Sequence, residues 1–124
     1  MACKTVLIVE DQIDFLAINK RFLERHGYQV LAAEDGEDGV RLAREHQPQL
    51  ILMDLSVPRL DGLGATRLLR EDPETERIPI ILLTAHSYGS VGRRMKAAGC
   101  DGYLAKPCDP RRVLEEVVRF IGEA

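Results

Sequence analysis

Four short apolar runs in the sequence each lead into polar residues of a different chemical kind. These residues are Glu10 and Asp11 after the first run, Asp54 after the second, Thr84 after the third and Lys106 after the fourth. Carboxylates can bind a divalent cation. Together with a hydroxyl and an ammonium group they can surround a phosphoryl group. We therefore expect an oxygen-rich site of phosphoryl size where the four run ends meet.

The apolar runs have the composition of buried strands in a parallel sheet. They consist of β-branched and aliphatic residues at 5–9, 50–53, 80–83 and 103–105, and turn-forming residues bound them. Residues 28–33 are mostly apolar and alternate enough around Gln29 to predict a further short strand. The sequence thus predicts five strands.

Apolar residues at helical spacing predict a helix after each strand. Gly27 and Gly99 are placed to end the first and fourth helices, and Pro48 follows the second. The predicted helices cover about 13–26 and 36–46, a stretch around 65–69 that ends before residue 71, residues 88–98, and a last stretch that contains 113–121.

This alternation of strands and helices predicts an α/β fold with helices on both faces of a five-stranded parallel sheet. Crossovers between parallel strands are right-handed, which leaves few topologies. The doubly wound order 2-1-3-4-5 places strands one and three side by side and puts ligands at the carboxyl ends of the strands. We therefore expect Glu10 and Asp11 to lie next to Asp54.

Three adjacent carboxylates repel one another and require positive charge nearby. At 4 Å, each pair costs about 4 kcal/mol with an effective dielectric constant near 20. Lys106 supplies one positive charge, which leaves a formal charge of about −2 that a divalent cation would cancel. Hard oxygen ligands without histidine or cysteine favour Mg²⁺.

Length and composition predict one small domain that spans residues 1–124, with no output domain. The chain has 124 residues, of which 45% are hydrophobic, and a net charge of −3 with both signs interspersed. This charge pattern argues against nucleic acid or membrane as a direct partner. The first residues lack a signal-peptide pattern, so we expect a cytoplasmic protein. The three cysteines lack metal-site spacing and are expected to be reduced.

The ordered set of run ends resembles the receiver domain of two-component response regulators, and it is similar to the single-domain chemotaxis regulators. The resemblance spans essentially the whole chain and implies the flavodoxin-like fold of that family. Its segments are VLIVED at 6–11, LMDLSVPRLDG at 52–62, LTA at 83–85 and GYLAKP at 102–107. A free-standing regulator and a receiver cut from a longer regulator or hybrid kinase would show the same pattern.

The resemblance implies that Asp54 accepts a phosphoryl group from a phosphohistidine of a sensor histidine kinase or a histidine phosphotransfer protein. It also implies that Mg²⁺ is held by Glu10, Asp11, Asp54 and the backbone carbonyl of Ser56, with Glu10 acting through water. Phosphoryl transfer depends mainly on positioning and charge neutralisation. A carboxylate nucleophile with a metal, an ammonium group and a hydroxyl around it is therefore a sufficient set.

The resemblance further implies a switch. Lys106 and Thr84 would bind phosphoryl oxygens, and the loop after Thr84 would move inward. Tyr103 would then swing into the vacated space and alter the surface of the fourth helix, fifth strand and fifth helix, where a downstream protein target binds. The bond before Pro107 is expected to be cis.

Two positions beside the expected acceptor are implied to tune how fast water removes the phosphoryl group. These are Ser56, two residues after Asp54, and His86, two residues after Thr84. We expect a switch that phosphorylates and dephosphorylates itself, and not an enzyme with a turnover substrate.

Other readings account for fewer residues. A pseudo-receiver that only docks partner proteins, without phosphorylation, is the main alternative, although such a protein is expected to lack part of the site. A haloacid-dehalogenase-type phosphatase would need a second aspartate where Ser56 stands. A nucleotide-binding domain would need a glycine-rich loop where residues 10–12 stand.

Overall fold

The computed structural model describes residues 4–85 and 88–124, in which strands and helices alternate. The strands are β1 (Thr5–Val9), β2 (Gln29–Ala33), β3 (Leu50–Asp54), β4 (Ile80–Thr84) and β5 (Gly102–Ala105), and the helices are α1 (Ile13–Arg25), α2 (Gly36–His46), α3 (Gly62–Glu71), α4 (Tyr88–Ala98) and α5 (Pro110–Ile121). Of the helices within the described ranges, none is long and apolar enough to cross a membrane.

The strands form one parallel sheet in the order β2-β1-β3-β4-β5, which confirms the predicted topology. Val9 at the end of β1 pairs with Met53 near the end of β3. Thr84 at the end of β4 pairs with Ala105 at the end of β5. Because all strands run in the same direction, the residues that follow these four strands meet at one edge of the sheet.

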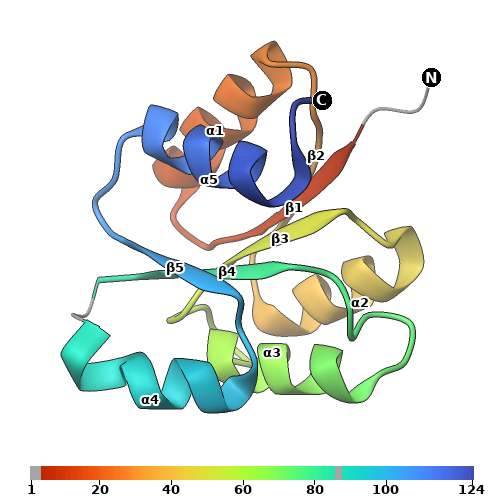
Figure 1. Cartoon of the computed structure of the whole chain (residues 1–124), viewed down its shortest axis with the longest axis vertical. Helices are drawn as coiled ribbons and strands as arrows, with labels where there is room; N and C mark the ends of the chain where they lie inside the picture. Colours follow the sequence, from red (N-terminus) through yellow and green to blue (C-terminus); the bar gives the residue numbers. More distant parts are fainter. Residues whose placement is uncertain (1–3, 86–87) are drawn as a thin grey trace.

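The sheet is covered by helices on both faces, with α1 and α5 on one face and α2, α3 and α4 on the other (Figure 1). Side chains alternate along each strand, so every central strand serves both faces. In β1, Leu7 and Val9 belong to the core beneath α2, α3 and α4. Val6 and Ile8 belong to the core beneath α1 and α5. All four are fully buried.

The predicted strand boundaries and those of the first, second and fourth helices differ from the structure by about one residue, whereas α3 begins at Gly62, before the predicted stretch around 65–69, and includes Glu71. The first helix ends at Arg25 and the second strand begins at Gln29. The N–H of Tyr28 donates to the carbonyl of Leu23, so Tyr28 closes the turn after α1 and does not pair with β1. Gly27 follows α1 with a φ of 93°, a left-handed conformation that suits glycine.

Candidate functional site

The three carboxylates expected at the sheet edge lie together. Glu10 and Asp11 follow β1, Asp54 ends β3, and one oxygen of each carboxylate lies within 4.8 Å of the others. Glu10 is fully buried and Asp54 is 6% exposed, whereas Asp11 is exposed. The strand order accounts for this arrangement, because β1 and β3 are neighbours. The cluster is therefore buried at its base and open to solvent on one side.

Lys106 joins this cluster from the end of β5. Its Nζ donates a hydrogen bond to the Glu10 carboxylate and lies 3.6 Å from Oδ2 of Asp54. It also donates to Oε1 of Gln12 at 3.1 Å and lies 4.5 Å from the centroid of the Phe15 ring. The lysine side chain is 11% exposed, so its charge acts in a partly desolvated environment. One ammonium group thus interacts with two of the three carboxylates.

The surroundings of the Glu10 carboxyl raise its pKa. Burial raises the pKa of Glu10 from 4.5 to about 7, and the neighbouring Asp54 adds to this rise. The hydrogen bonds from Lys106 and from the N–H of Gln12 oppose it. The single lysine therefore does not fully compensate for burial and for the adjacent carboxylate.

Asp54 faces an open cavity of about 340 Å³. Besides Asp54, the cavity is lined by Gln12, Phe15, Ser56, Ala85, Lys106 and Pro107. The N–H of Ser56 donates to Oδ1 of Asp54 at 3.3 Å, which folds the chain after β3 over the carboxylate. The cavity leaves one side of the aspartate accessible to a reactant of phosphoryl size.

Thr84 and Lys106 are held next to each other by the pairing of β4 with β5. Thr84 is buried, with 1% exposure, and its carbonyl accepts a hydrogen bond of 2.8 Å from the N–H of Lys106. The peptide bond between Lys106 and Pro107 is cis, as the resemblance implies. The threonine therefore lies at the same sheet edge as the acidic cluster.

Tyr103 lies on β5, and its side chain is 40% exposed. It lines a cavity of about 240 Å³ between α4 and β5 together with Met95, Lys96 and Cys100. This cavity is separate from the one at Asp54. His86, the other position expected to influence the site, lies outside the described residues.

Two residues contribute to the site although the sequence reasoning did not assign them to it. Gln12 accepts from Lys106 and binds Glu10 through its N–H, and Phe15 packs beneath the ammonium group. Gln12 follows Asp11 directly, and Phe15 lies in the first turn of α1. Phe15 fits the apolar spacing of the predicted first helix, which by itself indicates only a packing role. Its position one turn from the acidic pair was the signal that could have identified it.

The oxygen atoms at this site are the kind of ligand that a hard divalent cation prefers. Glu10, Asp11 and Asp54 offer carboxylate oxygens only, which suits Mg²⁺ better than metals that prefer nitrogen or sulfur ligands. Three carboxylates face one ammonium group in this cluster, so its formal charge remains negative when all three are ionised. Chemically, the arrangement combines an acidic cluster that could hold a divalent cation, an ammonium group, a hydroxyl and an accessible carboxylate.

Comparison with known proteins shows similarity over almost the whole chain. The model of the response regulator receiver domain family matches residues 6–118. The polar-differentiation response regulator DivK of Brucella anthropi is 36% identical over 121 residues, which make up 98% of each chain.

Solved structures are also similar to almost the whole chain. The receiver domain of a sensor histidine kinase from Pseudomonas aeruginosa PAO1 is 35% identical with a TM-score of 0.89, and the match covers 98% of this chain and 100% of that chain. That structure contains a magnesium ion in its active-site cleft. The chemotaxis protein CheY4 of Vibrio cholerae is 28% identical with a TM-score of 0.91, and 97% of this chain and 100% of that chain are covered.

Proposed function

Because this chain belongs to the response regulator receiver domain family of two-component signalling, we propose that it is a phosphorylation-dependent switch whose acceptor is Asp54. The partner is a sensor histidine kinase or a histidine phosphotransfer protein. One observation carries the proposal. A carboxylate oxygen of Asp54 lies within 4.8 Å of two other carboxylates, Oδ2 of Asp54 lies 3.6 Å from the Lys106 ammonium group, and Asp54 lines an open cavity.

Asp54 acts as the nucleophile. One of its carboxylate oxygens forms a bond to phosphorus, and the bond between phosphorus and the imidazole nitrogen of the partner's phosphohistidine breaks. The imidazole leaves with the electron pair of that bond. The N–H of Ser56 holds Oδ1 at 3.3 Å, which fixes the orientation of the carboxylate before the reaction. Such positioning is the main contribution that a protein makes to phosphoryl transfer.

The acidic cluster is proposed to hold Mg²⁺ through Glu10, Asp11, Asp54 and the backbone carbonyl of Ser56. The grouping of three carboxylates around a single ammonium group supports this assignment, as does the magnesium ion in the related Pseudomonas receiver domain. When bound, Mg²⁺ neutralises charge on the carboxylate and on the phosphoryl oxygens as they approach each other.

Lys106 and Thr84 bind the oxygens of the phosphoryl group. Lys106 is a compact cation already placed beside Asp54, so it can take a phosphoryl oxygen without a large movement. Thr84 lies at the end of β4, and its hydroxyl can donate to another phosphoryl oxygen. The phosphoryl group on Asp54 would thereby accept hydrogen bonds from both the ammonium group and the hydroxyl.

The phosphoryl group is proposed to change the surface formed by α4, β5 and α5, where a downstream protein target binds. Movement of Thr84 toward the phosphoryl group makes room for Tyr103, which is 40% exposed and borders the cavity between α4 and β5. Ser56, which lines the cavity at Asp54, and His86 set the rate at which water removes the group. The chain carries the phosphoryl group itself and has no turnover substrate.

Intact mass tests this proposal. The protein is incubated with a small acyl phosphate, with and without Mg²⁺, as wild type, as Asp54→Asn and as Asp14→Asn. Asp14 is a matched control, because it is an exposed carboxylate in the first turn of α1. We expect a metal-dependent single adduct in the wild type and in Asp14→Asn, and no adduct in Asp54→Asn. An adduct that persists in Asp54→Asn would refute Asp54 as the acceptor. The absence of an adduct in every sample would favour a pseudo-receiver that only docks partner proteins.

A further inference from the structure

The loop between β3 and α3, residues 55–61, packs against the first residue of α2 at a distance that only glycine allows. A Cβ atom added at Gly36 would lie 1.7 Å from the carbonyl oxygen of Leu60 and 2.6 Å from its carbonyl carbon. These are backbone atoms and cannot rotate away as a side chain can. The N–H of Gly36 also donates to the carbonyl of Pro58 at 3.3 Å. The backbone of α2 therefore supports the middle of the loop directly.

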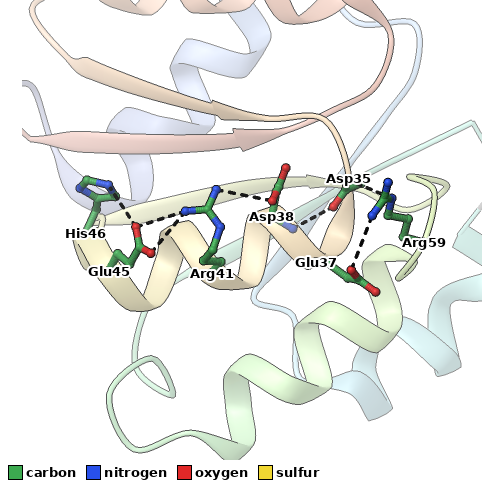
Figure 2. A network of polar contacts seen from close by, with 7 residues as sticks. All are labelled: Asp35, Glu37, Asp38, Arg41, Glu45, His46 and Arg59. Atoms are coloured by element: carbon green, nitrogen blue, oxygen red, sulfur yellow. Dashed lines mark hydrogen bonds and ion pairs between the residues drawn. The ribbon is translucent and has the colours of Figure 1, made fainter.

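Charged side chains connect the same two segments (Figure 2). Nε of Arg59 in the loop lies 3.7 Å from Oδ2 of Asp35, and its Nη1 lies 4.0 Å from Oε2 of Glu37. Asp35 is also the N-cap of α2, where its side chain accepts from the N–H of Asp38. Arg59 has a φ of 70°, a conformation that is uncommon for residues other than glycine. The tip of the loop is thus held in an unusual backbone conformation beside the start of α2.

The base of the same loop is closed against the expected acceptor. A Cβ atom added at Gly62 would lie 2.6 Å from the carbonyl oxygen of Asp54, and the N–H of Gly62 donates to the carbonyl of Leu55 at 3.0 Å. The N–H of Ser56 donates to the Asp54 carboxylate. With its base closed by Gly62 and its tip supported by Gly36, the loop has little room to shift without moving Ser56.

The geometry points to a positioning role for the start of α2. Gly36 and the pairing of Asp35 with Arg59 hold the loop so that the Ser56 backbone faces the acidic cluster. The contact between the start of α2 and the loop thereby sets the affinity of the cluster for a divalent cation. No α2 residue touches the cation. The inference rests on the proposed function, because it assumes that the cluster binds Mg²⁺.

The expected size of the effect follows from the demands of the ion. Mg²⁺ requires near-ideal octahedral geometry at short distances. Displacing one backbone ligand should therefore weaken binding even when all three carboxylates remain. Changes to residues that orient metal ligands typically cost about 10- to 100-fold in affinity. A Cβ at residue 36 must push the loop away from α2, so we expect an effect in this range.

Calorimetric titration of the full chain with Mg²⁺ tests the inference without any phosphorylation. Gly36→Ala should bind Mg²⁺ about tenfold or more weakly than the wild type. Ala43→Gly is the matched control, since Ala43 is fully buried in the same helix about two turns from residue 36. Ala43→Gly destabilises α2 without adding an atom against the loop. The affinity of this variant for Mg²⁺ should therefore stay within about twofold of the wild-type value. Gly36→Ala binding as tightly as the wild type would overturn the inference.

Arg59→Gln keeps the inference testable even if Gly36→Ala does not fold. By charge alone, removal of a positive side chain should leave cation binding unchanged or strengthen it. Positioning predicts the opposite, a weakening of about two- to threefold, because the loop loses its pairing with Asp35. Unchanged or tighter binding in Arg59→Gln would overturn the role of the pair. Failure of the wild type to bind Mg²⁺ would instead refute the proposed metal site itself.

Discussion

Arg70 near the end of α3 should contribute more to stability than any ordinary surface arginine. Its guanidinium donates to the carbonyls of Gly99 and Ile78, at 2.8 Å each, and to Oδ2 of Asp101 at 2.5 Å. These acceptors lie after α4, before β4 and before β5, respectively. The side chain is 20% exposed. One residue therefore joins three separate segments at the edge of the sheet opposite the acidic cluster.

The magnitude follows from the separate contacts. A hydrogen bond from a charged donor contributes about 1.5–3 kcal/mol, but carbonyls near the surface regain water when the donor is removed. The ion pair adds little, because Asp101 is 42% exposed. We therefore expect Arg70→Met to lower the free energy of unfolding by about 2–4 kcal/mol. Methionine retains most of the aliphatic packing against Gly99, so the loss measures mainly the polar contacts.

Urea denaturation followed by circular dichroism measures this loss, since the chain contains no tryptophan for fluorescence. Arg67→Met is the matched control, because Arg67 is an exposed arginine on the same helix. Its effect should stay within about 0.5 kcal/mol. An Arg70→Met loss no larger than that of Arg67→Met would refute the reasoning that these hydrogen bonds join the three segments.

The folded-state pKa of Glu10 is about 7, above its ordinary value of 4.5, so the metal-free native state binds a proton that the unfolded state has released. The free energy of unfolding should therefore fall by about 3 kcal/mol as the pH rises from 4.5 to above 7. Glu10→Gln should remove this pH dependence in urea titrations at several pH values. Tyr28→Phe should cost about 1 kcal/mol in the same assay, because the hydroxyl donates to the carbonyl of Gly122 at 2.5 Å; no loss would contradict a role for this bond. Amides in the first turn of α4 should exchange faster than those of α1, because Gly89 and Gly92 each cost about 1 kcal/mol in a helix; equal protection would contradict this.

The order of elements could be predicted from the sequence because strand runs and helical stripes are regular patterns. The orientation of individual side chains on the helices could not. Ile18 and Leu68 belong to the apolar spacing that locates α1 and α3, yet they are 55% and 41% exposed. In α1, Leu23 and the polar Asn19 are the buried residues. Helical periodicity places a helix, but only the packing of neighbouring elements decides which face is covered.

The site shows the same division between what the sequence reveals and what packing decides. Polar residues at strand ends are visible in the sequence, and the strand order brings Glu10, Asp11 and Asp54 together. The contacts of Lys106 with Gln12 and Phe15 also depend on how α1 leaves the sheet, which is decided by packing between segments that are far apart in the sequence. The close approach of Gly36 to the loop after β3 is likewise a long-range contact.

Chemical mapping of the phosphorylated residue tests the central claim most directly. Borohydride reduces an aspartyl phosphate to homoserine, which marks the acceptor in a peptide map of the protein after treatment with an acyl phosphate and Mg²⁺. We predict homoserine at position 54 alone. Homoserine at another position, such as 11 or 61, or phosphate on a residue other than aspartate, would contradict the assignment of Asp54 as the acceptor.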